Sequence, residues 1–337
     1  MKEELIVSGR MNLNIDPVLH IWHWQIPLYL FLGGLAAGVL FFASLYSIRN
    51  EEEKYSTAVK IAPILAPIAI IIGLIALLLD LKHKLYFWQL YTTIRLSSPM
   101  SWGAWVLMAI TPLSFVWVGI HLKEVFPKID FSQKFFGTLY KMFTKEQEGG
   151  VNWEWKFGWL TKLEKLAIEN KKMLAWAILL ASVILGVYTG ILLSAFNARP
   201  LWNTAILGPL FLVSGLSTGA ASIMWLSKSH EEQKLFSKID ILLIVIELFF
   251  IIHLFMGFMA GPQVQIESAA LFWGGEFTLY FGLFVVILGL IMPGIFEVME
   301  LNGYHIHVAI PALMILVGGL IFRFVIVEAG QITRYLY

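Results

Sequence analysis

The chain has 337 residues, of which 58% are apolar and only 14% are Asp, Glu, Lys or Arg. Its mean hydropathy is +0.76. A soluble globular domain carries about 25% charged residues, so these proportions exclude a water-soluble fold of this size and predict an integral membrane protein. The net charge of +1 gives no basis for nucleic-acid binding.

Cysteine is absent from the chain. This absence excludes disulfides, thiolate zinc sites, cysteine nucleophiles and any iron–sulfur cluster held by this chain alone. If the protein handles electrons, a partner or a diffusible cofactor must therefore carry them.

Apolar runs long enough to cross a bilayer recur along the whole chain. A helix of about 20 residues spans a hydrocarbon core of roughly 30 Å, and each span must be helical because lipid offers no partner to open backbone groups. Eight runs meet this criterion: 26–48, 61–81, 102–122, 173–195, 201–226, 239–260, 270–296 and 305–327. An even number of spans places both termini on one side.

The distribution of Lys and Arg predicts which side that is. Segments on the side of the termini carry seven of these residues, and the opposite loops carry sixteen. Positive loops stay in the cytoplasm, so both termini are expected on the outer, periplasmic side of a cytoplasmic membrane. Without the long loop's ten lysines the counts are six against seven, so the prediction depends on that loop.

The predicted spans divide the chain into four segments. Residues 1–126 hold helices one to three, 127–172 form a long cytoplasmic loop, 173–197 hold helix four, and 198–337 hold the last four helices. In the loop, aromatic residues recur at helical spacing among lysines, which is typical of amphipathic helices lying in the membrane interface. A simple anchor between two groups of helices is favoured over a binding role.

A faint internal repeat relates the two halves. The run from Pro27 to Gly38 in the first span is similar to the run from Pro209 to Gly219 in the fifth. Spans four apart run in the same direction, so the similarity suggests two parallel four-helix halves. The alternative is that small residues four apart recur independently in packed membrane helices. Both interpretations stay open.

Ionisable side chains inside the predicted spans are candidates for a functional role, because placing each one in hydrocarbon costs on the order of 3 kcal/mol. The deep candidates are Glu247, His253, Glu276 and Arg323. Except for Glu247, they fall on the half of their helices nearer the termini, as do Asp80, Tyr188 and Tyr29. One-sided clustering favours a site at that membrane face, although Glu276 and Arg323 could instead neutralise each other.

The histidines give no basis for an intrinsic haem. A transmembrane b-type haem needs two imidazoles at matching depth on facing helices, and of the eight histidines only His253 lies clearly inside a span. A quinone pocket suits the remaining polar and aromatic residues better, because a quinone needs an apolar slot with a few polar groups. The expected set is Tyr29, His23, Asp80, His83, Trp102, Trp105, Tyr188 and Trp202. Asp80 or His83 would exchange the protons.

Several motifs resemble one membrane-protein family. Trp22-His-Trp24 through Gly38 is similar to the opening helix of the NrfD/polysulfide reductase membrane subunits. Ser97-Ser-Pro99-Met-Ser101-Trp-Gly-Ala-Trp105 resembles the family's Ser-Pro-x-x-Trp-Gly-Ala-Trp stretch. Tyr188-Thr-Gly190, Arg199-Pro-Leu-Trp-Asn203 and Ser214-Gly-Leu-Ser-Thr-Gly219 resemble its fourth and fifth helices. The resemblance covers roughly residues 20–226.

The resemblance implies eight transmembrane helices in two four-helix bundles and no haem. Members exchange electrons between a quinone, often menaquinone, and a ferredoxin-like subunit with four iron–sulfur clusters. That subunit often relays to a molybdopterin enzyme or a multihaem cytochrome. The family's quinone contacts correspond here to Tyr29 and Tyr188, and its acidic end of helix two corresponds to Asp80. Some relatives have an asparagine where this chain has Ile26, which cannot donate a hydrogen bond to a quinone. The resemblance therefore does not decide between menaquinone and ubiquinone.

Three interpretations of function follow. The first is a quinone-reactive membrane subunit of an oxidoreductase complex, which would not be catalytic alone. The second is a transporter or ion-translocating subunit without redox chemistry, and the third is a purely structural anchor. A mixed form of the first couples quinone chemistry to proton movement, with Glu247, His253, Glu276 and Arg323 as candidates for the path. Glu247 and His253 lie about 240° apart around a helix, so their side chains do not line one path along it.

Overall fold

The structure is a computed structural model that describes residues 22–127, 143–146 and 153–335. Within these residues, eight helices are long and apolar enough to cross a membrane, which confirms the predicted number. The spanning segments are α1 (Gln25–Ile48), η3–η4–α2 (Thr57–Asp80), α4 (Pro99–Val125), α7 (Lys171–Ser194), α8 (Leu207–Leu226), α9 (His230–Met259), η6–α11 (Leu279–Leu301) and α12 (Ala309–Ile332).

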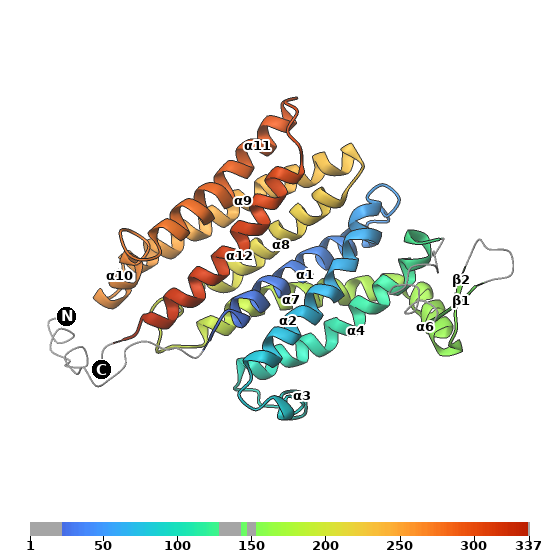
Figure 1. The fold of residues 1–337 in the computed structure, drawn as a ribbon, viewed down its shortest axis with the longest axis horizontal. Coiled ribbons are helices and arrows are strands. Elements are labelled where there is room, and N and C mark those ends of the chain that lie inside the picture. Colours follow the sequence, from blue (N-terminus) through green and yellow to red (C-terminus); the bar gives the residue numbers. More distant parts are fainter. Residues whose placement is uncertain (1–21, 128–142, 147–152, 336–337) are drawn as a thin grey trace.

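The helices alternate in direction, so α1 begins and α12 ends at the same end of the molecule (Figure 1). We call this the terminal end. It also carries the short helices α3 (Gln89–Thr92) and α10 (Gln263–Ala270), whereas the other end, the opposite end, carries the α8–α9 and α11–α12 turns.

Helix α1 and helix α8 lie at the centre of the packing. Helix α1 contacts α2, α7, α8 and α12, while α8 contacts α7, α9 and α12. Gly38 of α1 faces Gly215 and Gly219 of α8, and a β-carbon on Gly38 would overlap the carbonyl oxygen of Gly215. Small residues four apart therefore let the two backbones touch, as in other packed membrane helices.

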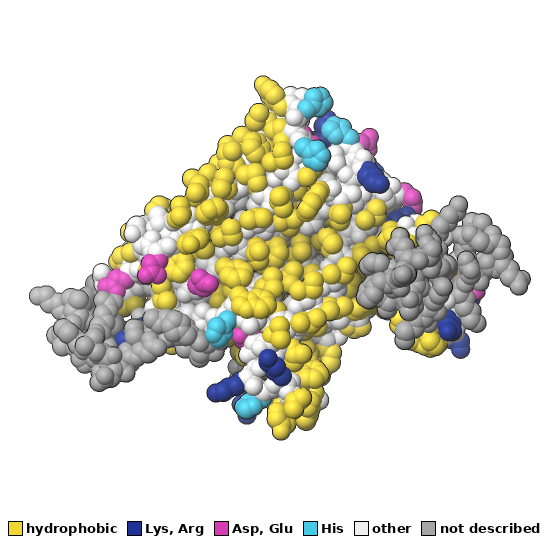
Figure 2. Space-filling view, in the orientation of Figure 1, with side chains coloured by type: hydrophobic (Ala, Val, Ile, Leu, Met, Phe, Trp, Pro, Cys, Tyr) yellow, Lys and Arg dark blue, Asp and Glu magenta, His cyan; other side chains and the backbone are white. Residues whose placement is uncertain are grey.

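An apolar band covers the middle of the molecule. Hydrophobic side chains fill the centre of the visible face, and charged and histidine side chains gather towards its two ends (Figure 2). Large apolar residues such as Ile75, Met256 and Leu180 point outwards from the spanning helices. A lipid environment explains this exposure, which would be unfavourable in water.

Helix ends differ most from the sequence-based boundaries around the sixth and seventh spans. Helix α9 begins at His230, nine residues before the predicted start at 239, because polar residues extend the helix beyond its apolar part. The seventh span was predicted from residue 270, but it begins at Leu279. The chain turns at Gly274, whose φ of 103° suits glycine.

The long loop contains two strands that the sequence did not predict. Strands β1 (Thr144–Glu146) and β2 (Trp153–Trp155) pair antiparallel, with Thr144 opposite Trp155. Helix α6 (Gly158–Glu169) follows and exposes Trp159, Leu163 and Leu166. Interfacial helices were predicted for the loop at 127–172, of which residues 128–142 and 147–152 lie outside the described residues.

Candidate functional site

An apolar cleft opens at the terminal end between α4 and α7. Its volume is about 540 Å³, within the range of small-molecule sites. Pro99 and Trp102 of α4 form one wall, while Ile184, Val187 and Tyr188 of α7 form the other. Helix α4 begins at Pro99 because proline suits the first helical position, where its missing N–H costs nothing.

Tyr188 and Ser97 supply the hydroxyl groups of the cleft, and Tyr188 is the one on a membrane-spanning helix. Its side chain is buried, and its hydroxyl makes no hydrogen bond to any residue in the described part of the chain. The phenol packs directly on Gly103 of α4, where a β-carbon would overlap the hydroxyl. The hydroxyl is thus held in place by packing and is available to a bound molecule.

Trp102 forms a fixed aromatic wall. Its side chain is half exposed, and its indole Nε1 donates a hydrogen bond to the backbone oxygen of Leu96 at 2.9 Å. Because this bond uses its only donor, the ring offers a bound molecule its apolar surface. Trp105 is also partly exposed, one turn further along α4, but it is not part of the cleft lining.

Tyr29 lies inside the helix packing behind the cleft. It is 3% exposed, and its ring packs against Gly73 of α2. The phenols of Tyr188 and Tyr91, from α7 and α3, lie near it. Burial raises the pKa of Tyr91. The sequence analysis missed Tyr91 because it lies outside the predicted spans and outside the family motifs.

His23 and Asp80 lie together at the terminal end. The imidazole Nδ1 is 3.9 Å from a carboxylate oxygen of Asp80, and His23 is largely exposed while Asp80 is mostly covered. His23 precedes α1 and Asp80 ends α2, so the pair links the buried end of α2 to the exposed surface. His83 is separate from the pair: it lies exposed in the following loop, with its ring against Tyr86.

Trp202 lies in the α7–α8 connection, away from the cleft lining. It is fully buried, and its Nε1 donates to the backbone oxygen of Ile326 at 2.8 Å. Its ring also packs on Trp22, with centroids 5.2 Å apart, and on Gly330. These contacts tie α12 to the residues that precede α1.

The four ionisable residues predicted in the second half fall into two groups. Glu247 and Arg323 are buried and interact electrostatically in the middle of the molecule. Arg323 donates to Ser214 Oγ and to the backbone oxygen of Phe211, and its guanidinium lies 4.7 Å from the Phe211 ring centre. His253 and Glu276 are exposed and lie apart from this pair.

Two buried acids were missed by the sequence analysis. Asp240 of α9 and Glu297 of α11 are both fully buried. They lie at the edges of the predicted sixth and seventh spans, which were drawn too short at these ends. Asp240 lies seven residues before Glu247, a spacing of two helical turns that places both on one face of α9, and this spacing was the available signal.

These features define the class: a multi-pass integral membrane protein with eight spanning helices and an apolar, tyrosine-bearing cleft at one end. The family model described as "Polysulphide reductase, NrfD" matches residues 12–334. The chain therefore belongs to the NrfD/polysulfide reductase family, which confirms the resemblance and extends it beyond residue 226.

Curated relatives agree with this assignment. The sequence is 31% identical to a chain of the polysulfide reductase of Wolinella succinogenes, over 92% of this chain and 94% of the relative. It is 30% identical to protein NrfD of Escherichia coli, over 93% of this chain and 96% of the relative. It is also 24% identical to a subunit of the selenate reductase of Mesobacillus selenatarsenatis, over 65% of this chain and 51% of that protein.

Proposed function

We propose that the protein is the quinone-reactive membrane subunit of a multi-subunit reductase complex. The observation that carries the proposal is the free hydroxyl of Tyr188 in a mostly apolar cleft with an aromatic wall. A quinone ring needs such an environment, with one hydrogen-bond donor for a carbonyl oxygen. The relatives named as parts of polysulfide and selenate reductases support a role within such a complex.

The chain's own residues have distinct tasks in this proposal. Tyr188 donates a hydrogen bond to a quinone carbonyl, and Trp102 with Val187 holds the ring and excludes water. A bound quinone supplies two-electron, two-proton chemistry. Asp80, beside the exposed His23, exchanges protons with water. Tyr29 supports Tyr188 from behind. Trp105, His83 and Trp202 stay predictions without a contact to the cleft.

A tyrosine substitution tests the site. Tyr188→Phe removes the donor and keeps the ring. In quinone-dependent electron transfer by the assembled complex, the KM for quinone should rise about three- to tenfold, because one net hydrogen bond is lost. Tyr280→Phe is the matched control, because Tyr280 is exposed on η6. An unchanged KM in Tyr188→Phe, with unaltered binding of a quinone-site inhibitor, would contradict the proposal.

The electron partner is proposed to be a ferredoxin-like iron–sulfur subunit that docks at the terminal end, itself joined to a molybdopterin enzyme or a multihaem cytochrome. The α2–α4 connection there exposes a run of large apolar side chains: Leu85, Tyr86, Phe87, Trp88, Ile94 and Leu96. Leu96 also lines the cleft. An exposed apolar patch of this kind marks an interaction surface, and docking here would bring a cluster close to the quinone.

Docking can be tested with a charge in the patch. Leu85 is 87% exposed, so Leu85→Glu should leave the fold intact and reduce co-purification of the iron–sulfur subunit. Trp159→Glu at the opposite end of the molecule is the control, because Trp159 is also exposed. Equal recovery of the partner with both variants would place the interface elsewhere.

The arrangement of helices and its orientation are also proposed. Helices α1, α2, α4 and α7 would form one four-helix bundle, and α8, α9, η6–α11 and α12 the second, joined along the close α1–α8 contact. The lysine-rich loop favours a cytoplasmic opposite end and a periplasmic terminal end. Since the chain has no cysteine, Ser97→Cys should react with an impermeant maleimide from the periplasm and Asn302→Cys should not.

A transporter without redox chemistry has less support. It would need a solute site at mid-depth between moving halves, but α1 and α8 meet backbone to backbone at Gly38 and Gly215. The cavity beside Glu247 has a volume of only about 10 Å³. Proton coupling through the second half stays a prediction, and of the residues named for it only Glu247 and Arg323 lie together.

A further inference from the structure

Asp240 and Glu297 form a buried pair of acids between α9 and α11. The two helices pack against each other, and both acidic side chains are fully buried. Ser217 Oγ donates to one oxygen of Asp240 at 2.7 Å. The other Asp240 oxygen and both Glu297 oxygens make no hydrogen bond of good geometry within the described residues. Two unpaired negative charges in so apolar a place would repel strongly, so the pair must retain at least one proton.

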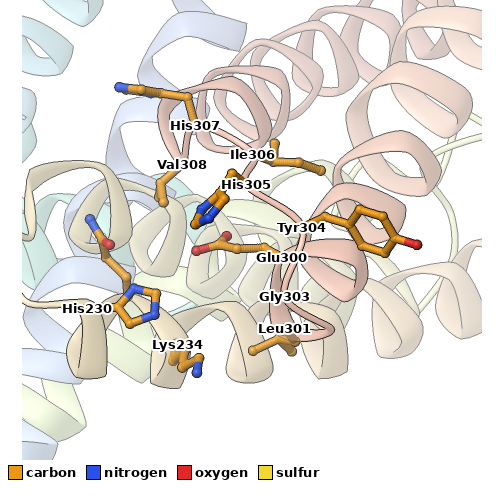
Figure 3. A pocket seen from close by; sticks show the side chains of 11 residues that line it. His230, Lys234, Glu300, Leu301, Gly303, Tyr304, His305, Ile306, His307 and Val308 are labelled. Atoms are coloured by element: carbon orange, nitrogen blue, oxygen red, sulfur yellow. The ribbon is translucent and has the colours of Figure 1, made fainter.

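The pair has a connection to the opposite end. Glu300 follows Glu297 by three residues, which places both on one face of α11. Glu300 is 9% exposed, and one of its oxygens has no partner in the described chain. It lines a pocket of about 390 Å³ together with His230, Lys234, His305 and His307. In Figure 3, Glu300 and His305 point toward one another in this pocket.

The pair also has a connection towards the centre. Ser217, the partner of Asp240, lines a small internal cavity with Ser214, Thr218 and Glu247. The cavity volume of about 10 Å³ is near the least space that one water needs, and the polar side chains could bind that water. Ser214 in turn accepts a hydrogen bond from Arg323, whose charge faces Glu247.

The order of these groups follows the directions of their helices. Helix α11 ends at the opposite end, so Glu297 lies deeper than Glu300. Helix α9 runs from that end towards the terminal end, so Glu247 lies about two turns, or roughly 10 Å, beyond Asp240. Polar groups therefore continue from the pocket to the middle of the molecule, where Arg323 approaches Gly34 of α1.

We propose that Glu300, Glu297, Asp240 and Glu247 form a proton relay that connects the pocket at the opposite end with the centre of the molecule. Each carboxyl group accepts a proton on one oxygen and releases one from the other, and Ser217 with one water bridges Asp240 to Glu247. His230 and His305 exchange protons with water at the pocket. The relay rests on the proposed quinone function and is a second proton route, from the opposite end, beside the exchange that Asp80 and His23 make at the terminal end.

Reconstituted vesicles test the relay. The assembled complex is placed in sealed vesicles with a menaquinone analogue and reduced methyl viologen as electron donor, and pyranine reports pH in the compartment that the opposite end faces. Quinone reduction should raise the pH there. In Glu297→Gln and Asp240→Asn, the protons taken up from that compartment per quinol formed should fall about tenfold or more.

Two further variants separate proton transfer from folding. Glu297→Asp keeps a carboxyl group and should restore most of the proton uptake per quinol. Glu328→Gln is the matched control, because Glu328 lies exposed on α12 of the same half and should leave uptake unchanged. Normal uptake per quinol in Glu297→Gln, or no uptake from this compartment in the unmodified complex, would overturn the relay alone. An unmodified complex that forms no quinol would overturn the quinone proposal as well.

Discussion

The hydroxyl of Tyr188 lies against the α-carbon of Gly103, in the space that a side chain at residue 103 would occupy. One residue belongs to α7 and the other to α4, so this contact sets both the helix spacing and the position of the phenol. The Trp-Gly-Ala-Trp motif and the tyrosine of helix four therefore contact each other and depend on one another for their positions.

The first prediction concerns that contact. Gly103→Ala places a methyl group where the Tyr188 hydroxyl lies, so the phenol must move by about an ångström, and quinone turnover should fall by about tenfold or more. Gly119→Ala is the control on the same helix, because nothing lies within 4 Å of a β-carbon there. Steady-state kinetics of the assembled complex measures both. Equal activity of the two variants would contradict the role of the contact.

The second prediction concerns the α1–α8 crossing. Gly38→Ala would force the two backbones apart and should lower the free energy of unfolding by about 1–3 kcal/mol, the usual effect of overpacking. Gly257→Ala on α9 meets open space and should be neutral or slightly stabilising. Thermal unfolding of the purified protein in detergent compares them, and a fully stable Gly38→Ala protein would show that the crossing can relax.

The third prediction concerns pH. Burial would raise the pKa of Glu52, but hydrogen bonds from Lys171 and Ser47 outweigh burial and lower this pKa below its ordinary value of 4.5. A lowered pKa stabilises the fold above the ordinary value, and the contribution is lost as the pH falls through the folded-state pKa. Glu52→Gln should therefore unfold a few degrees earlier at neutral pH, and its difference from the unmodified protein should shrink below pH 4.5.

A neighbouring residue provides the control for that measurement. The Glu53 side chain is 91% exposed, so Glu53→Gln should change the unfolding temperature little at any pH. If Glu52→Gln and Glu53→Gln gave the same curves, the link between α7 and the α1–α2 connection would contribute nothing to stability.

The fourth prediction concerns Trp202. Trp202→Phe removes the hydrogen bond to Ile326 and leaves a small void, so the free energy of unfolding should fall by about 1–3 kcal/mol. Because the ring does not line the cleft, the KM for quinone should not change. Trp176→Phe is the control on exposed surface. A raised KM in Trp202→Phe with unchanged stability would restore Trp202 to the quinone site.

The sequence predicted the spanning helices, and it singled out two residues that line the candidate cleft, because both depend on local signals. Long apolar runs indicate helices in lipid, and the motifs around Trp102 and Tyr188 indicated two residues that share the cleft. The direction in which a side chain points is harder to predict. His253 and Glu276 lie in or beside spans, yet both are exposed, because uniformly apolar helices give little indication of their inward face.

Buried acids were missed for a related reason. Asp240 and Glu297 lie where apolar runs give way to polar residues, so hydropathy placed them at the membrane surface. The helices extend further, and neighbouring helices cover these residues completely. Strands β1 and β2 were also missed, since each has only three residues and their pairing joins segments across an intervening loop.

The outer rim of the cleft consists of side chains that would touch lipid, including Ile184 and Ile191. A hydrophobic molecule could thus enter sideways from within the bilayer without passing through water. Its occupancy would then depend on its mole fraction among the lipids, so adding empty vesicles at constant total quinone would dilute the substrate and slow the reaction.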